Sequence, residues 1–588
     1  MKNNYKVPAM LSIFGLLLLG SCKKSFLTPN PLSIFTPENT YVDKGSMIAL
    51  LNTSRVKLRN EFLNDNPLIS TEYNASDLTV NGETAPQSLK DFDTQLTPNG
   101  AGNSKILDNS DSGGESSYWS AAWDAVKAAN IVITRHSQAK YSSEADKNEI
   151  LSEGYFHRAY WYYRIVNQYG DVPLLLEEIT KPTLDLQTSS RKRILRKMMA
   201  DMEFAVKWLP VNAPRGAVNR AAGYHLLTKI YLCLGMFDQA ISAANEVINK
   251  SGLALMTNRF GVDKANPKYN VLWDLFRKQN ISLAENTEGI LIGQDRYQVV
   301  GGTASGSQRT RTYGPLWTGI TGTTRNLGDP QYVYLLRGIA RSRPSVSLAY
   351  GIWANSSGDY RHTWPNWFPM DSLKYNNPAN PAQFNKPIPK SAVTDTIRCW
   401  FPFQYYKIVV PDEVNSPLIS NDARGGYTDV YIFRLAETYL LRAEAYYWKN
   451  LMSNAADDIN AVRRRANAPL IGPADVTMDY ILDERARELF TEEPRKTELT
   501  RIAFIMADQG KNGYSTGNID KKNYFYDRVM AANNFYGGKL VAGGIPFKMS
   551  PFHMLWPIPQ SNINANTGGQ INQNLGYTGS ESNVAPLE

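Results

Sequence analysis

The sequence predicts a mainly α protein, an α-α superhelix of paired helices that carries a large loop-rich inserted region. Three observations support this fold class. Apolar side chains recur at helical spacing in several segments before residue 250 and again after residue 427. Two of these segments repeat one order of aromatic, turn and small residues. Residues 251–426 between them are rich in Gly, Pro, Trp and Tyr and show little helical periodicity.

The composition is that of an ordinary globular chain. Of 588 residues, 43% are hydrophobic and 20% are charged, which excludes a disordered, collagen-like or disulfide-scaffold protein. The formal net charge is +8, but Lys2 and Lys6 belong to an N-terminal segment that we expect to be removed. The basic runs at residues 191–193 and 463–465 fall on helical patterns, where solvated faces or helix-end partners are expected. The sequence therefore gives no reason to expect nucleic acid as a partner.

The first 21 residues are typical of a signal peptide. A basic start is followed by an apolar run over residues 7–19, which is too short to span a bilayer as a helix. The run ends in Leu-Gly-Ser-Cys at residues 19–22, which resembles a bacterial lipobox. We therefore predict that Cys22 carries a lipid anchor. A polar tether over residues 22–37 would follow.

Residues 38–250 predict a helical N-terminal part. Thr36 and Pro37 are typical of an N-cap and a first helical position, so a helix is expected from there to about Phe62. A loop-rich stretch follows over residues 64–114. Further helices are predicted at residues 118–136, 143–169 and 188–209, and a helical hairpin is predicted at residues 217–250.

The hairpin at residues 217–250 matches the tetratricopeptide template, in which an aromatic residue, a tight turn and a small residue occupy fixed places. The same order returns near residue 450. In both segments nine residues separate the aromatic from the small residue, and the turn residue favours the left-handed conformation. The residues are Tyr231, Gly235 and Ala240 in the first hairpin and Tyr446, Asn450 and Ala455 in the second.

Residues 427–588 predict this second hairpin, a helical block and an irregular tail. The block runs from about Asp475 to Asp508 and has an apolar face opposite a charged face. The tail is expected to dock on the helices through apolar side chains. The apolar face consists of Ile481, Leu482, Leu489 and Phe490, the charged face of Glu484, Arg485, Arg487 and Glu488, and the docking residues are Phe552, Leu555, Trp556 and Ile558.

Several segments, in order, resemble the SusD/RagB family of outer-membrane nutrient-binding lipoproteins. Besides the lipobox, the resemblance rests on EGYFHRAY at residues 153–160, YGDVPL at 169–174 and YIFRLAE at 431–437. It continues in RAEA at residues 442–445, INAVRRRA at 459–466, DERARELF at 483–490, LWPIP at 555–559 and QNLGY at 573–577. Nearly the whole chain is covered.

This resemblance implies a tetratricopeptide-like frame with a loop-rich region that binds a glycan or another nutrient at the cell surface. It also implies a TonB-dependent transporter of the SusC type as partner, over which the lipoprotein sits as a lid. One feature departs from the family. Export to the surface is often associated with acidic residues after the lipidated cysteine, whereas Lys23 and Lys24 follow Cys22 here.

A glycan requires flat aromatic surfaces for its C–H faces and planar polar groups for its hydroxyls. Residues 313–368 contain five Tyr and four Trp, about twice the density of the whole chain. The resemblance adds the loop before the second long helix to the site. The predicted ligand-binding residues are Tyr73, Asn74, Asp77, Trp317, Tyr350, Trp353, Asp359, Arg361, Trp364 and Trp367.

The sequence predicts no catalytic residues, metal or cofactor. The G-x-S-x-G pattern at residues 513–517 follows a helix rather than a strand, unlike a nucleophile elbow. Glu484 and Glu488 alternate with arginines, which favours a structural charge network over a catalytic acid pair. Acidic residues at 108, 111 and 115 lack calcium-loop spacing. A glycan-cleaving enzyme and a scaffold that binds only protein remain the alternatives.

Overall fold

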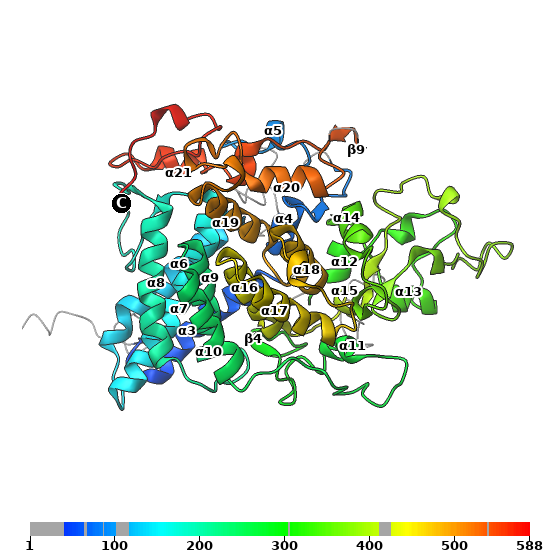
Figure 1. The fold of residues 1–588 in the computed structure, drawn as a ribbon, viewed down its shortest axis with the longest axis horizontal. Coiled ribbons are helices and arrows are strands. Elements are labelled where there is room, and N and C mark those ends of the chain that lie inside the picture. The colour runs from blue at the N-terminus through cyan, green and yellow to red at the C-terminus, as the bar shows by residue number, and fades with distance from the viewer. Residues whose placement is uncertain are drawn as a thin grey trace, which may run out of the picture.

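The structure is a computed structural model, and it describes residues 40–63, 67–85, 88–100, 117–303, 306–410, 425–537 and 540–588. Helices form its body, and the predicted mainly α fold class is confirmed (Figure 1). The N-terminal helices stand side by side at one end, and the helices between residues 435 and 508 cross the middle. The loop-rich residues lie at the other end, and the C-terminal residues run along one edge.

Long helices form the N-terminal part, and serine hydroxyls cap the N-termini of several of them. Ser117, Ser143 and Ser190 each accept a hydrogen bond from the backbone N–H three residues further along the chain. Such a cap satisfies a donor that the helix itself leaves free. The helices are α3 (Lys44–Asn60), α6 (Tyr118–Arg135), α7 (Glu144–Tyr169), α8 (Arg191–Trp208), α9 (Arg220–Cys233) and α10 (Phe237–Lys250).

The beginning of α3 differs from the prediction of one helix over residues 36–62. Asp43 is in extended conformation, pairs with Lys140 in a β-bridge, and caps α3 by accepting a hydrogen bond from the Ser46 N–H at 2.8 Å. This capping box ends any continuous helix before Lys44. Residues 36–39, the signal peptide and Cys22 lie outside the described residues.

The two tetratricopeptide-like hairpins are present and lie side by side. α9 and α10 form the first, and α16 (Leu435–Trp448) and α17 (Met452–Arg465) form the second, with α10 packed on α16. Gly235 and Asn450 adopt φ of 69° and 60° at the turns, as predicted. Ala240 and Ala455 are fully buried where the paired helices approach.

The loop-rich region contains short helices and two-stranded antiparallel pairs. Its helices are α11 (Val271–Leu275), α12 (Arg309–Tyr313), α13 (Pro330–Leu335), α14 (Val346–Ala349) and α15 (Tyr405–Ile408). Strand β4 (Gly289–Gly293) pairs with β8 (Val430–Arg434), so the chain leaves the helical frame and returns to it at one place. The region is therefore anchored at a shared base.

The remaining short elements join distant segments. The strand pairs are β1 (Thr79–Val80) with β5 (Arg343–Pro344), β2 (Val172–Pro173) with β3 (Thr188–Ser189), β6 (Trp367–Phe368) with β7 (Phe403–Gln404), and β9 (Val541–Ala542) with β10 (Ile545–Pro546). The short helices are α4 (Ile69–Asn74), α5 (Phe92–Gln95), α20 (Tyr524–Ala532) and α21 (Gln560–Ala565).

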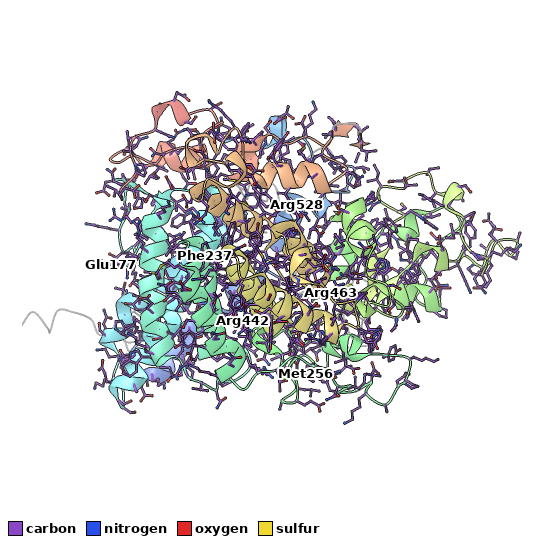
Figure 2. The ribbon with its side chains drawn as sticks, viewed as in Figure 1. Glu177, Phe237, Met256, Arg442, Arg463 and Arg528 are labelled. Atoms are coloured by element: carbon purple, nitrogen blue, oxygen red, sulfur yellow. The ribbon has the colours of Figure 1, made fainter. Side chains whose placement is uncertain are left out.

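The predicted helical block after residue 475 consists of α18 (Met478–Leu489) and α19 (Arg495–Asp508), and its charged face is buried. Glu488 accepts hydrogen bonds from Arg361 at 3.0 Å, from Arg434 at 2.6 Å and from Arg465. Figure 2 places Arg442 and Arg463 among these central helices. The expectation that the arginines at 463–465 lie on a solvated face is wrong for Arg463 and Arg465, because buried carboxylates from other segments neutralise them.

The C-terminal tail docks on the frame as predicted. Trp556 and Ile558 are fully buried, and the Trp556 N–H donates to the Gln168 carbonyl of α7 at 2.7 Å. The two cysteines among the described residues, Cys233 and Cys399, are buried and unpaired. Across the described ranges, no helix is both long and apolar enough to cross a bilayer.

Candidate functional site

The predicted ligand-binding residues separate by exposure. Trp364 and Tyr350 expose 57% of their surface each, and Asn74 is partly buried. The other predicted residues lie in the interior. They are Tyr73, Asp77, Trp317, Trp353, Asp359, Arg361 and Trp367.

The prediction that five rings lie on the surface is wrong for Trp317, Trp353 and Trp367. The indole N–H of Trp317 donates to the Leu336 carbonyl and that of Trp353 to the Leu348 carbonyl, both at 2.8 Å. These carbonyls satisfy the buried indole donors, so the rings can pack inside. These three rings belong to the main hydrophobic core, which extends from the helices into the loop-rich region.

The predicted hydroxyl partners Asp359 and Arg361 are also interior. The Arg361 guanidinium contacts the Asp359 carboxylate at 2.7 Å, Glu484 at 2.8 Å and Glu488 at 3.0 Å. The carboxylates of Asp359, Glu484 and Glu488 hold the pKa of Arg361 well above its usual value despite its burial. These side chains join the loop-rich region to α18.

The predicted residues that precede the second long helix, Tyr73, Asn74 and Asp77, also make structural contacts with other segments. Asp77 is bound by Arg495 at 2.7 Å and Arg528 at 3.0 Å. Burial alone would raise the pKa of Asp77, but the two guanidinium groups lower it to about 2. Tyr73 packs edge-on against Tyr313 and Phe490. Asn74 donates to the Arg341 carbonyl at 3.0 Å.

Trp364 belongs to a group of stacked rings that reaches the surface, which we call the aromatic surface. Trp364 and Tyr334 are its exposed members, Tyr334 at 38% exposure, and Tyr269 is half-buried. Trp273 and Tyr405 lie behind them in the interior.

The rings from Tyr269 through Trp273 and Tyr405 to Tyr334 are stacked, whereas Trp364 is tilted against Tyr334. Tyr269 and Trp273 have centroids 4.2 Å apart at 1°, and Trp273 and Tyr405 are 5.9 Å apart at 13°. Tyr405 and Tyr334 are 4.6 Å apart at 21°, and Tyr334 and Trp364 are 6.1 Å apart at 39°. Such offset stacking stabilises each ring pair beyond simple burial. The exposed rings therefore rest on a rigid aromatic base.

Short helices and amide side chains position these rings. Asn270 caps α11 by accepting hydrogen bonds from the Leu272 and Trp273 N–H groups. Asn366 donates to Asn270 at 2.9 Å. The hydroxyl of Tyr405 donates to the Tyr334 carbonyl at 3.1 Å and thereby joins α15 to α13. Two pairs of distant segments are thus joined.

The phenols of Tyr334 and Tyr405 stay neutral at ordinary pH. Burial raises the pKa of Tyr334 to about 12 and that of Tyr405 well above its usual value. A neutral ring with a hydroxyl at its edge offers an apolar face and a hydrogen-bonding group together. This arrangement suits a flat ligand that carries hydroxyl groups.

Sequence reasoning found Trp364 but not its neighbours. Tyr334 lies in the aromatic-rich segment, whereas Tyr269, Trp273 and Tyr405 lie outside it. The i, i+4 spacing of Tyr269 and Trp273, directly around the capping Asn270, is a signal that could have found these two. Tyr405 comes close to the other rings only through the tertiary path of the chain, so no local pattern indicates it.

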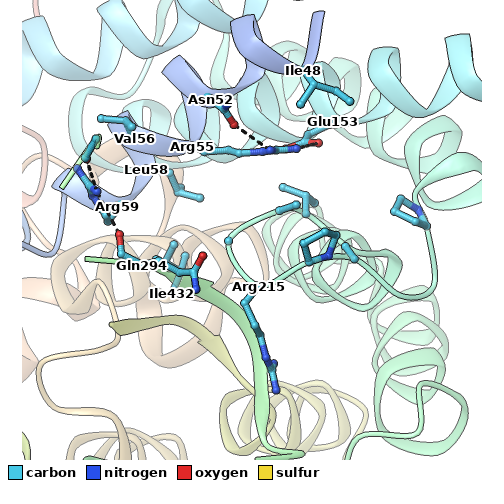
Figure 3. Close-up of a pocket in the computed structure, with 18 of the residues that line it drawn as sticks. Ile48, Asn52, Arg55, Val56, Leu58, Arg59, Glu153, Arg215, Gln294 and Ile432 are labelled. Atoms are coloured by element: carbon cyan, nitrogen blue, oxygen red, sulfur yellow. Dashed lines mark hydrogen bonds and ion pairs between the residues drawn. The ribbon is translucent and has the colours of Figure 1, made fainter. Parts of the chain in front are cut away.

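A cavity of about 880 Å³ lies beside α3, and none of the predicted residues lines it (Figure 3). Its walls come from α3, the first half of α7, the loop at residues 210–218, and the loop that follows β4. In its wall Arg55 pairs with Glu153 at 2.6 Å, and Asn52 accepts a hydrogen bond from Arg55 at 2.9 Å. Among the described residues that line it, none is Trp, Tyr or Phe.

The alternative catalytic patterns have unsuitable surroundings. Glu484 is buried among arginines, of which Arg361, Arg487 and Arg463 lower its pKa to about 2 against the effect of burial. An acid of this strength stays ionised and cannot donate a proton at neutral pH. Ser515 begins a 3-10 turn between α19 and α20, so the strand-to-helix turn of a nucleophile elbow is not formed there. The acidic residues at 108, 111 and 115 lie outside the described residues.

Two family patterns match the chain. The pattern described as the SusD family matches residues 342–577. A SusD-like pattern described as starch-binding and associating with the outer membrane matches residues 40–232.

Individual proteins agree with these matches. SusD-like protein P2 of Formosa agariphila is 23% identical over 507 residues, which cover 83% of this chain and 87% of that protein. The starch-binding protein SusD of Bacteroides thetaiotaomicron is 34% identical over 150 residues, which cover 26% of this chain and 22% of that protein. The fold is similar to surface glycan-binding protein A of B. thetaiotaomicron, solved with laminarihexaose. Its TM-score is 0.60 at 16% identity, with 90% of this chain and 99% of that chain covered.

Proposed function

Because the chain belongs to the SusD/RagB family, we propose that it captures a glycan at the cell surface without cleaving it. A lipid on Cys22 anchors it to the outer membrane, facing the cell exterior. A TonB-dependent transporter of the SusC type receives the glycan. Binding of modest affinity suffices, since apposition to the transporter raises the effective concentration of the ligand.

The observation that carries this proposal is the aromatic surface. Trp364 and Tyr334 are exposed to solvent, and both contact the buried ring of Tyr405, which in turn stacks on Trp273. Exposed aromatic rings cost free energy in water unless a ligand covers them, and the C–H face of a sugar is a suitable cover. Rigid rings also lose little entropy on binding. The binding residues that we now propose are therefore Trp364 and Tyr334, with Tyr350 as a separate exposed candidate.

The names of similar proteins support a glycan as ligand. One curated relative is named for starch binding, and one similar structure holds laminarihexaose. Both compounds are neutral glucose polymers. The neutral phenols and the indole of the aromatic surface are compatible with such a ligand, since neither ring type needs a charged partner.

The absence of catalysis is supported by the state of the buried carboxylates. Glu484 and Glu488 are held ionised by several arginines each, and neither carboxylate reaches solvent. Glycoside cleavage requires one protonated carboxyl group beside the sugar. Turnover of a polysaccharide by the purified chain, abolished by one carboxylate substitution, would favour the alternative of a glycan-cleaving enzyme.

Affinity gel electrophoresis tests the glycan proposal. The purified mature chain is run through gels that contain laminarin, starch, xylan or pectin. We expect at least one polysaccharide to retard it, and Trp364→Ala to remove most of the retardation. Trp208→Ala is the matched control, because Trp208 is 37% exposed on α8, outside the aromatic surface. Normal migration of the native chain in every gel, or equal loss in both variants, would reject the proposal.

Co-purification tests the partner and the anchor. The chain is isolated from outer membranes with mild detergent, and the proteins that elute with it are identified. We expect a TonB-dependent transporter in stoichiometric amount, and release of the chain into the soluble fraction after Cys22→Ala. A chain that binds the transporter but no glycan would instead support the protein-only scaffold.

A further inference from the structure

Arg277 lies directly behind the aromatic surface. This residue follows α11 in the sequence, and it exposes 8% of its surface. Its guanidinium carbon is 3.8 Å from the centroid of the Trp273 indole. Its Nη2 donates to the Tyr406 carbonyl at 2.9 Å, and its Nε donates to the Trp273 carbonyl at 3.4 Å. Arg277 therefore contacts two of the segments that supply rings to the surface.

The indole of Trp273 is enclosed on both faces. The Tyr269 ring stacks on one face at 4.2 Å, nearly parallel. A second group at 3.8 Å cannot share that face, so the Arg277 guanidinium covers the opposite one. The indole N–H donates to Asp263 at 2.8 Å, which fixes the rotation of the ring. The orientation of Trp273 is thus set by Arg277, Tyr269 and Asp263 together.

The hydrogen bond to the Tyr406 carbonyl extends this control to α15. Tyr405 precedes Tyr406 directly, and its ring contacts both Trp273 and Tyr334. A planar guanidinium holds two acceptors and a ring face at fixed angles, which a lysine ammonium does not do. The distance between the rings of α11 and α15 therefore depends on Arg277.

The energetics of Arg277 favour a role in placement over a role in stability. Burial lowers its pKa, whereas nearby Tyr405 and Asp263 raise it. No described carboxylate lies within 4.0 Å of its guanidinium, in contrast to the paired arginines of the charge network. Burying a cation without such a partner costs desolvation free energy. For Arg277 this cost is offset mainly by the contact with the Trp273 ring and by the hydrogen bonds to the two carbonyls.

We propose that Arg277 is the positioning residue of the aromatic surface. Its guanidinium sets the spacing of Trp273 and Tyr405, and these rings in turn fix Tyr334 and Trp364 for the ligand. This inference rests on the proposed function for its effect on binding. The placement of the rings themselves can be measured without any ligand. Preorganised rings raise affinity because the ligand does not have to order them.

The test uses Arg277→Met and Arg277→Lys in the full mature chain, with Arg191→Met as the matched control. Arg191 is also buried, and its guanidinium carbon is 4.2 Å from the Phe504 ring, on the other side of the molecule. Three quantities are measured for each variant. They are the midpoint of urea unfolding, the near-ultraviolet circular dichroism of the aromatic rings, and retardation in the polysaccharide gel.

We expect Arg277→Met to weaken retention about tenfold and to reduce the dichroism that arises from the stacked Trp and Tyr rings. Arg277→Lys restores stability more fully than retention, because it keeps the charge but not the planar fork. Arg191→Met lowers the unfolding midpoint and leaves the other two readouts unchanged. If Arg277→Met does not fold, Arg277→Lys alone carries the comparison.

Two results would overturn the inference. One is a dichroism spectrum of the folded Arg277 variants that equals the native spectrum. The other is a loss of retention that is no larger than that of Arg191→Met. If the native chain binds no polysaccharide, the proposed function fails, while the dichroism still decides whether Arg277 positions the rings.

Discussion

The aromatic surface and the cavity beside α3 are two regions of very different chemistry. The first is a group of contacting rings with Trp364 and Tyr334 exposed. The second has a volume of about 880 Å³, with aliphatic side chains such as Leu58 and Ile432 and the Arg55–Glu153 ion pair in its walls. Each is built where segments far apart in sequence meet.

This difference shows that volume alone does not locate a glycan site. The cavity has a size typical of ligand pockets. It lacks flat rings among its described lining residues, however, and its Arg55 and Glu153 side chains already bind one another. The exposed rings of the aromatic surface offer apolar area that a ligand can cover. We therefore place glycan binding at the rings.

The largest expected effect tests whether exposure, and not aromatic character, defines the surface. Trp353 stacks on His362 in the interior, although it lies only eleven residues before Trp364. We expect Trp353→Ala to lower the free energy of unfolding by about 3–5 kcal/mol, because it leaves a cavity. Urea unfolding measures this. A folded Trp353→Ala variant of native stability with weakened retention would place Trp353 in the binding surface instead.

A second substitution tests whether the charges of the cavity serve the fold. Glu153 is buried, and Arg55→Met removes the guanidinium that binds both of its carboxylate oxygens. We expect unfolding free energy to fall by about 2–3 kcal/mol, less than for a fully buried pair because Arg55 is partly exposed. Retention in the polysaccharide gel should not change. A loss of retention with native stability would indicate that a ligand binds in the cavity.

The same pair has a defined pH dependence. Burial alone would raise the pKa of Glu153, but His157 at 3.6 Å and Arg55 lower it to about 2. A depressed pKa stabilises the folded chain above the unfolded value of about 4.3, and this contribution is lost as pH falls from there toward 2. Unfolding midpoints at pH 3 and pH 6 should therefore differ more in the native chain than in Arg55→Met.

A smaller effect is expected at the second exposed ring. Tyr334→Ala should weaken retention about fivefold, since a half-exposed ring contributes less contact than Trp364. Tyr334→Phe keeps the ring face and should retain most of the affinity. Because the pKa of Tyr334 is about 12, retention of the native chain should be constant from pH 6 to pH 9. A decline across that range would contradict binding by neutral phenols.

The smallest effect concerns the cavity itself. Asn52 lines the cavity, whereas the adjacent Thr53 is exposed on α3 but does not line it. Asn52→Trp fills space in the cavity, and Thr53→Trp is its matched control. Both should change retention less than twofold, because neither touches the aromatic surface. Selective loss in Asn52→Trp would move the glycan site to the cavity.

Much of the helical frame could be predicted from local patterns. The ends of α6, α7 and α8 lie within about three residues of their predicted ends, because serine caps and apolar periodicity act within a few residues of chain. The turns at Gly235 and Asn450 were predictable for the same reason. The start of α3 was predicted wrongly from Thr36 and Pro37, although the Asp43–Ser46 capping box that sets it is also a local pattern.

The site was predictable as a region and not residue by residue. An aromatic-rich segment can bury its rings or expose them, and the sequence between residues 313 and 368 contains no periodic pattern that distinguishes the two. Trp367 is buried because β6, to which it belongs, pairs with β7 from a later segment and because its ring packs on Trp353 and His362, whereas Trp364 stays exposed. Whether a ring is buried depends on the packing of the entire chain.

By itself, the sequence determined the signal peptide pattern, the helix pairs and the concentration of rings after residue 313, since each depends on neighbouring residues. The tertiary structure alone decided which rings meet solvent, and it placed Arg277 behind Trp273 and Tyr405. It also turned the predicted charged face of α18 into a buried network, because oppositely charged groups from distant segments converge there. Such convergence depends on the path of the entire chain, which no short segment specifies.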